Sequence, residues 1–226
     1  MLQAIVFDFD GVIADSEPLH FRAFRDVLAD EGVELGERDY YDRYLGFSDA
    51  DAFRAIRADR GRLWSADQLV GLALRKAARF KEIEHAGVLF PGAEAAIRRA
   101  AAAVPVAIAS GALRSEILRV LDAADLTRCF TAIVADGDTA ESKPAPDPYR
   151  RAVELLSVGR PSPIDPGECV AIEDSPWGLE SARSAGLRTV AVGNAYEASS
   201  LAAADLIIRN LSELDLSILH DLALRK

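Results

Sequence analysis

Short apolar runs rich in β-branched residues recur along the chain. They lie at residues 3–7, 104–109, 131–134, 169–172, 188–192 and 205–208. From the second run onward they alternate with helical patterns at residues 92–102, 112–122, 148–157 and 177–185. Each of these helical patterns is flanked by Gly or Pro. Strands that alternate with helices are typical of right-handed βαβ units. The pattern therefore predicts an α/β fold, with a Rossmann-like parallel sheet and helices on both of its faces.

The segment between the first two runs has a different pattern, because it shows helical periodicity and no strand signal. Ser16 and Pro18 are typical of a helix start, and Ser65 to Gln68 form a capping-box pattern before another amphipathic stretch. We expect an inserted cap of four helices at residues 15–87. Residues 1–14 and 88–226 then form the catalytic core, and turn residues near both crossings would let the cap hinge over the strand ends.

Composition and charge limit the partners. The 226 residues carry a formal net charge of −10, with a pI near 4.8. This balance disfavours binding to nucleic acid or to a membrane surface through a general basic face. Neither Cys129 nor Cys169 has the spacing of a zinc site or a disulfide scaffold, and we find no signal peptide and no run long enough for a membrane helix. We therefore expect a reduced, cytoplasmic protein.

Carboxylates follow the first apolar run. Asp8 and Asp10 would project to the same side of an extended chain, where like charges repel. A cation must lie beside them, or one of them must hold a proton. Ligands of open parallel sheets bind outside the carboxyl ends of the strands, so the polar residues near those ends form one candidate site. The others are Ser110, Gly111, Lys143, Glu173, Asp174 and Ser175.

Each of these features has a purely structural alternative. Asp10 and Gly11 can form a turn, Ser110 and Gly111 a strand-to-helix turn, and Ser175 and Pro176 a helix start. Lys143 can be a surface charge, although lysine occurs only at positions 76, 81, 143 and 226. The structural alternatives do not explain why all of these residues fall at the same edge of the predicted sheet.

The residue types at this edge favour phosphate chemistry. Carboxylate oxygens suit Mg²⁺, which takes one or two carboxylates together with substrate phosphate. A carboxylate that attacks phosphate meets a repulsion of about 4 kcal/mol per charge pair at about 4 Å and an effective dielectric constant near 20. Mg²⁺ and Lys143 together supply enough positive charge to offset that repulsion. In this interpretation the metal pairs with Asp8, and Asp10 can hold a proton.

The motifs Asp8-Phe9-Asp10-Gly11-Val12-Ile13, Ser110, Lys143-Pro144 and Glu173-Asp174-Ser175 resemble, in order, the four motifs of the haloacid dehalogenase superfamily. The resemblance covers essentially the whole chain. The cap position is similar to that of the subfamily with phosphoglycolate phosphatases and β-phosphoglucomutases.

This resemblance implies that Asp8 forms an aspartyl phosphate and that Asp10 acts first as an acid and then as a base. It implies Mg²⁺ on Asp8, the Asp10 carbonyl and Asp174, with Glu173 nearby or acting through water. Ser110, beside Gly111, would contact the phosphoryl group, and Lys143 would balance charge. Because dehalogenases lack the second aspartate, Asp10 indicates phosphate esters.

The resemblance also makes Glu17, His20, Ser48 and Lys76 candidates for substrate binding. Lys76 shares a helix face with apolar residues, so it either snorkels to solvent or points into the crevice and binds an anion. His20 is either a packed helix residue or a substrate contact.

Two positions depart from the family pattern. The mutases have an arginine in a Gly-x-Ser-Arg cap segment, where this chain has Gly46-Phe47-Ser48-Asp49. An aspartate there would repel a second phosphate. Gly111 stands where many relatives have a polar side chain, which would loosen phosphate orientation or make room for a bulkier substrate.

The leading hypothesis is a Mg²⁺-dependent phosphatase acting on a small phosphorylated metabolite, of the sugar phosphate or phosphoglycolate type. The alternative is a sugar-phosphate mutase similar to β-phosphoglucomutase. A non-catalytic regulator that binds phosphorylated metabolites is disfavoured, because it has no need of both a nucleophile and an acid. Both a monomer and a homodimer remain open.

Overall fold

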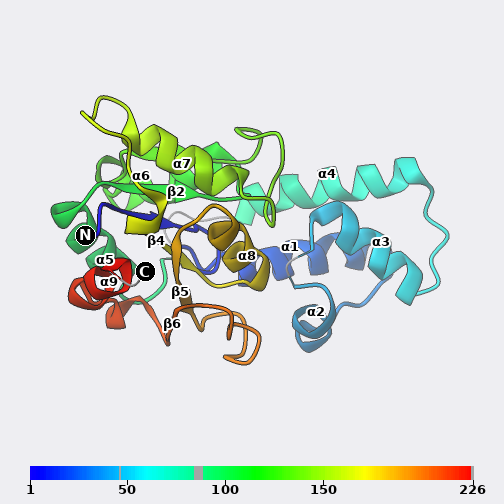
Figure 1. Cartoon of the computed structure of the whole chain (residues 1–226). Helices are drawn as coiled ribbons and strands as arrows, with labels where there is room; N and C mark the ends of the chain where they lie inside the picture. Colours follow the sequence, from blue (N-terminus) through cyan, green and yellow to red (C-terminus); the bar gives the residue numbers. More distant parts are fainter. Residues whose placement is uncertain (46, 84–88, 225–226) are drawn as a thin grey trace. The chain divides into compact units, whose positions relative to one another are not determined.

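The computed structural model describes residues 1–45, 47–83 and 89–224 (Figure 1). The chain divides into two compact units. The core unit consists of Met1–Asp15 and Ala86–Lys226, and the cap unit is Ser16–His85. The predicted boundary between residues 87 and 88 lies outside the described residues, and the predicted domain limits stay a prediction.

A parallel sheet forms the centre of the core unit. Its strands are β1 (Ala4–Phe7), β2 (Val106–Ala109), β3 (Ala132–Val134), β4 (Cys169–Glu173), β5 (Arg188–Val192) and β6 (Leu206–Ile208). The strand order is β3-β2-β1-β4-β5-β6, and every neighbouring pair is parallel. This order is typical of doubly wound sheets, in which the connections run outward from the middle in both directions.

Helices cover both faces of the sheet (Figure 1). They are α5 (Ala93–Ala103), α6 (Arg114–Ala123), α7 (Asp147–Ser157), α8 (Pro176–Ser184) and α9 (Leu216–Leu224), with short 3-10 turns η1 (Thr127–Cys129), η2 (Pro166–Glu168) and η3 (Leu211–Glu213). Because side chains alternate along a strand, Ile5 and Phe7 pack with α5, α6 and α9, whereas Ala4 and Val6 pack with α7 and α8. The predicted fold class is confirmed, while α9 is an addition that the periodicity did not indicate.

The cap unit contains α1 (Glu17–Asp30), α2 (Glu37–Arg43), α3 (Asp49–Asp59) and α4 (Ala66–Ile83). Aromatic side chains dominate its core, where Phe24 contacts Tyr40 and Phe53 with ring centroids 5.7 and 5.0 Å apart. The predicted capping box is present, because Ser65 N donates to Gln68 Oε1 (2.8 Å) and Gln68 N donates to Ser65 Oγ (3.2 Å). Among the described residues, no helix has the length and apolar character needed to cross a bilayer.

Candidate active site

The strand order brings the first and fourth motifs together. β1 and β4 are neighbours, and the sheet changes its winding direction between them, which is where open α/β sheets form a crevice. Asp8 extends the ladder past the end of β1, since its backbone N–H donates to Ile172 O at 2.9 Å. Asp174 follows directly after β4. Pairing between the two strands therefore positions both carboxylates.

Lys143 joins this pair from the segment before α7. Its Nζ lies 2.8 Å from Asp8 Oδ1 and 2.6 Å from Glu173 Oε1. The side chain of Lys143 is only 13% exposed, so its interpretation as a surface charge is wrong. Oxygens of Asp8, Glu173 and Asp174 all lie within 4.8 Å of one another, and all three residues are buried. The site thus contains more negative than positive charge.

Two glycines let the carboxylates approach the backbone. Gly11 has φ +77°, and a Cβ at this position would overlap the Asp174 carboxylate. Asn194 holds the same loop, because its Nδ2 donates to Gly11 O at 2.7 Å. In the first turns of α8, a Cβ at Gly178 would overlap the Glu173 carboxylate. Close packing therefore fixes both acidic side chains in the site.

Glu173 is saturated by protein donors. Its Oε1 accepts from Lys143 Nζ and from Tyr149 Oη, the latter at 2.7 Å. Its Oε2 accepts from Asp174 N (3.1 Å), Ser175 N (3.4 Å) and Ser175 Oγ (3.2 Å). A carboxylate has about four lone-pair positions, so these donors occupy its capacity. Ser175 also caps α8 through Gly178 N (3.1 Å), which confirms the helix-start interpretation without excluding the acidic site.

Burial and charge perturb the acid–base properties of the site. Burial, with the Glu173 and Asp10 carboxylates, raises the pKa of Asp8 to about 7, although Lys143 opposes that rise. Burial and the charges of Asp8 and Glu173 hold the pKa of Asp174 well above its usual value. Burial lowers the pKa of Lys143, but the two adjacent carboxylates outweigh burial and keep it above the ordinary range. The lysine is therefore permanently charged, while the aspartates lack a sufficient counter-ion.

The donor set fits a hard divalent cation. Asp8 and Asp174 offer carboxylate oxygens whose charge the protein only partly balances, and a cation there would relieve the repulsion that raises their pKa values. The oxygens of Glu173 are already engaged, so this residue is better placed to act through water than directly. Asp10 is half-buried, and its backbone forms a bridge with Ala14. All four predicted ligand roles stay predictions.

Ser110 and Gly111 come directly after β2, the strand on the other side of β1. Ser110 is 4% exposed, and its Oγ accepts from Ala112 N at 3.0 Å. Gly111 is exposed, and a Cβ at this position would meet no atom within 4 Å. The strand-to-helix turn is thus present, and the missing side chain leaves open space beside Ser110.

In the cap unit, Lys76 is the centre of a separate polar cluster. Its Nζ lies 2.6 Å from Asp49 Oδ1 and 2.6 Å from His20 Nδ1, and it faces the rings of Phe24 (4.7 Å) and Phe80 (5.2 Å). Lys76 is 2% exposed, so the snorkelling alternative is wrong. Burial and the charge of Lys76 lower the pKa of His20 to about 3, so the imidazole is neutral.

The other two cap candidates have intramolecular partners. Glu17 accepts a hydrogen bond from Tyr40 Oη. Ser48 caps α3, because its Oγ accepts from Asp51 N at 3.2 Å and donates to Asp51 Oδ2 at 2.6 Å. Gly46, the first residue of the cap segment compared with the mutases, lies outside the described residues. Substrate contacts by Glu17, His20, Ser48 and Lys76 stay predictions.

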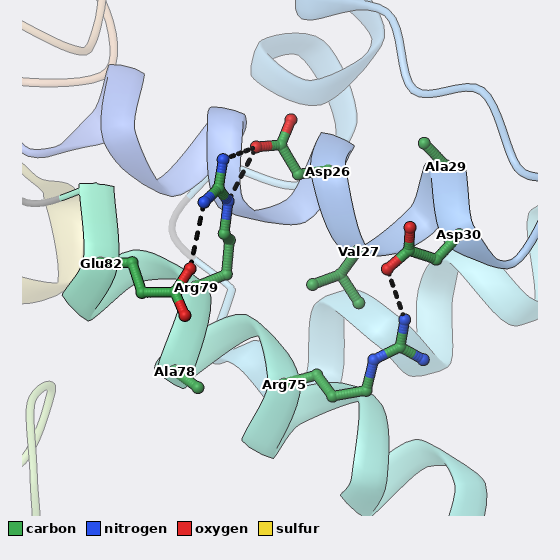
Figure 2. Close-up of a pocket in the computed structure, with 8 residues that line it drawn as sticks. All are labelled: Asp26, Val27, Ala29, Asp30, Arg75, Ala78, Arg79 and Glu82. Atoms are coloured by element: carbon green, nitrogen blue, oxygen red, sulfur yellow. Dashed lines mark hydrogen bonds and ion pairs between the residues drawn. The ribbon is translucent and has the colours of Figure 1, made fainter.

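Figure 2 shows a shallow pocket between α1 and α4 that is lined by paired charges. Arg79 donates to Asp26 (2.9 and 3.0 Å) and to Glu82 (3.1 Å), while Arg75 donates to Asp30 (2.8 Å). The pairs with Asp26 and Asp30 connect the two helices, the pair with Glu82 lies within α4, and all of them leave the two arginines engaged with protein carboxylates. We interpret the pocket as part of the helix packing.

Sequence reasoning missed Tyr149 and Asn194. Asn194 comes two residues after β5, so the rule that polar residues near strand ends form the site could have found it. Tyr149 lies in the first turn of α7, where a buried aromatic residue is indistinguishable in sequence from ordinary core.

The comparisons with known proteins identify the family. The family model that describes haloacid dehalogenase-like hydrolases matches residues 2–186. The chain belongs to this family. Protein CbbY of Rhodobacter capsulatus is 34% identical over 93% of this chain and 94% of its own length. Hexitol phosphatase B of Escherichia coli is 30% identical over 93% of both chains, and β-phosphoglucomutase of Bacillus subtilis is 29% identical over 97% of this chain and 95% of its own.

Among solved structures, CbbY from Rhodobacter sphaeroides in complex with xylulose-(1,5)bisphosphate is similar, with a TM-score of 0.78 and 27% identity. The match covers 97% of this chain and 99% of that one. The recognition of the haloacid dehalogenase family from its four motifs is therefore confirmed, and the protein is an enzyme of the hydrolase type.

Proposed function

We propose that this protein is a Mg²⁺-dependent phosphatase that hydrolyses a small phosphorylated sugar through an aspartyl phosphate on Asp8. The observation that carries the proposal is the position of Lys143 between Asp8 and Glu173, beside Asp174. A nucleophilic carboxylate needs concentrated positive charge to approach phosphate, and this site supplies one fixed cation and the ligands for another.

In the first step, an Asp8 oxygen attacks phosphorus and the bond between phosphorus and the sugar oxygen breaks. Asp10 donates its proton to the departing oxygen, so the sugar leaves as an alcohol. Asp8 directly follows β1 and is still paired with β4 through its backbone N–H, whereas Asp10 lies two residues further along in the following loop. This spacing gives the nucleophile and the acid different environments within one short segment.

In the second step, Asp10 is the base. It takes a proton from water, whose oxygen attacks the aspartyl phosphate, and the bond between phosphorus and Asp8 breaks. Inorganic phosphate leaves and Asp8 is again a carboxylate. Lys143 remains next to Asp8 throughout and stabilises the charge of the phosphoryl oxygens.

Mg²⁺ would be held by Asp8, Asp174 and the backbone carbonyl of Asp10, and it would supply positive charge that lowers the repulsion between nucleophile and substrate. Ser110, which is buried at the end of β2, would donate its hydroxyl to the phosphoryl group.

The names of the relatives support a sugar phosphate as substrate. One is a hexitol phosphatase, and one related structure contains a sugar bisphosphate. Within the cap, Asp49 compensates the charge of Lys76. A compensated cluster suits hydroxyl groups better than a second phosphate, and we propose a sugar monophosphate for that reason. A cytoplasmic location, and a monomer or a homodimer, stay predictions.

The mutase alternative rests on the similarity to β-phosphoglucomutase over nearly the full chain. A mutase must hold a sugar bisphosphate and return one phosphate to it. The Asp49–Lys76 ion pair disfavours that function, because Asp49 compensates the charge of the lysine that would otherwise attract a second phosphate.

The test is release of inorganic phosphate from a panel of hexitol, hexose and pentose phosphates and phosphoglycolate, with Mg²⁺ or with EDTA. We expect Mg²⁺-dependent release that the Asp8→Asn variant loses, whereas Asp221→Asn, at an exposed position of α9, retains it. β-Glucose 1-phosphate is assayed for isomerisation in parallel. Isomerisation faster than release would favour the mutase, and release that persists in Asp8→Asn would refute the proposed nucleophile.

A further inference from the structure

Tyr149 is a buried polar residue that none of the four motifs accounts for. It is fully buried in the first turn of α7, six positions after Lys143. Its hydroxyl donates to Glu173 Oε1 at 2.7 Å, and the centroid of its ring lies 5.1 Å from Lys143 Nζ. One side chain therefore contacts both the lysine and the acid that flanks it.

The hydrogen bonds restrict the Glu173 carboxylate. Oε1 is shared between Lys143 and Tyr149, while backbone and hydroxyl donors of residues 174 and 175 hold Oε2. The backbone of Gly178 packs directly against the same carboxylate and leaves no room for a Cβ atom. Glu173 is consequently a fixed acceptor, and its Oε1 atom divides its hydrogen bonding between Lys143 and Tyr149.

The lysine is held from two directions. Glu173 attracts its ammonium from one side and Asp8 from the other, with separations of 2.6 and 2.8 Å. The aromatic face of Tyr149 contributes a cation–π contact. An ammonium group has three N–H donors, and among the described residues two carboxylates account for two of them.

We propose that Tyr149 is a positioning residue that keeps Lys143 directed at Asp8. Its hydroxyl shares the Oε1 atom of Glu173, which limits the pull of that oxygen on the ammonium. Without the hydroxyl, Oε1 has Lys143 as its main partner, and the lysine moves toward Glu173 and away from the nucleophile. This inference rests on the proposed function for its catalytic consequence, but the position of the lysine does not depend on any activity.

The Tyr149→Phe variant tests the inference, since it keeps the ring and removes the hydroxyl. We expect a fall in kcat of about tenfold, the lower end of the range for loss of one hydrogen bond to a charged group, with KM changed by less than about twofold. Tyr44→Phe is the matched control, because Tyr44 Oη donates to Asp59 Oδ2 at the same 2.7 Å in the cap unit. It should leave kcat unchanged.

A double-mutant cycle identifies the residue through which Tyr149 acts. If the hydroxyl acts through Glu173, then Tyr149→Phe in a Glu173→Gln background should change kcat by less than about twofold. Additive effects of the two substitutions would overturn the proposal, because they would show that Tyr149 acts independently of Glu173, for instance through general packing.

A crystal structure of Tyr149→Phe supplies the readout that is independent of activity. We expect a longer separation between Lys143 Nζ and Asp8 Oδ1 than in the wild-type crystal, and an unchanged separation would overturn the proposal. If wild-type protein released no phosphate from any ester, the proposed function would fail, while the movement of Lys143 would still decide the role of Tyr149.

Discussion

Two buried lysines, Lys143 in the core unit and Lys76 in the cap unit, have opposite electrostatic surroundings. Lys143 contacts two carboxylates, and the third carboxylate of Asp174 lies nearby. Lys76 contacts one carboxylate, a neutral imidazole and the faces of two aromatic rings. The core site therefore lacks positive charge, whereas the cap cluster is close to neutral.

The difference indicates what each cluster can bind. A site with excess negative charge recruits a metal cation, and through that cation a phosphate. A neutral cluster of hydrogen-bonding groups has no such requirement and recognises hydroxyl groups. We infer that the core unit binds the metal and the phosphate, and that the cap unit selects between the polar, uncharged parts of different substrates.

The largest effect should come from removing each lysine in turn. Lys143→Met leaves three buried carboxylates without a fixed cation, and we expect kcat/KM to fall by about 10² to 10³. Lys76→Met leaves Asp49 partly accessible to water, with 34% of its side chain exposed, so the loss should be about tenfold and mainly in KM. Steady-state kinetics measures both, with circular dichroism to confirm folding. Equal losses in the two variants would contradict the comparison.

A second prediction concerns metal binding and pH. The pKa of Asp8 is about 7 in the metal-free protein, so at about pH 5 a metal must displace its proton. The affinity for Mg²⁺ should therefore be about 100-fold lower at pH 5 than above pH 7. Isothermal titration calorimetry checks this, and Asp8→Asn should abolish that part of the pH dependence. Affinity that does not change with pH would show that Asp8 is not a ligand.

The raised pKa of Asp8 also determines how the folding stability of the metal-free protein changes with pH. Because the folded-state pKa of Asp8 is raised, protonated Asp8 favours the folded state, and this contribution is fully present below the unfolded pKa near 4. It is lost as the pH rises through about 7.

The third prediction reverses the charge of the cap cluster. Asp49→Arg removes the counter-ion of Lys76 and adds a cation, so the ratio of kcat/KM for sugar bisphosphates to that for monophosphates should rise about tenfold. Asp51→Arg, in the same first turn of α3 and 56% exposed, should leave the ratio unchanged. A ratio that rises equally in both variants would mean that the added charge acts only at long range.

The smallest effect should come from His20. Its pKa is lowered to about 3, so neutral His20 stabilises the folded state above its unfolded pKa near 6.5, and this contribution is lost as the pH falls toward 3. At about pH 5.5 the loss should be about 1 kcal/mol. Urea denaturation of the wild type and of His20→Phe, which keeps a ring against Phe80, measures it. An identical pH dependence in both proteins would contradict the neutral imidazole.

Much of the core site could be predicted because strand ends are local features. The apolar runs located β1 and β4, and pairing of parallel strands then placed Asp8 near Asp174. Lys143 could be placed at the same edge from its position before a helix. The pattern could not show that Tyr149 donates a hydrogen bond to Glu173, the acid that contacts Lys143. That contact depends on the packing of α7 on the sheet.

The cap was harder to predict for the same reason. Periodicity placed Lys76 on the apolar face of its helix, which the structure confirms. Its neutralisation depends on Asp49 from α3 and His20 from α1, and the way that three helices pack cannot be read from the period of any one of them. Charge alone predicts that Asp49 disfavours a second phosphate, which stays a prediction, but the sequence does not show the ion pair between Asp49 and Lys76.

The geometry of the site depends on Gly178 as well as on the acidic and basic motif residues. A methyl group there would occupy the space of the Glu173 carboxylate, and Glu173 could move aside only by breaking its hydrogen bonds to Lys143, Tyr149 and the start of α8. An alanine at position 178 would therefore disturb the geometry of the site even in a chain that keeps every acidic and basic motif residue.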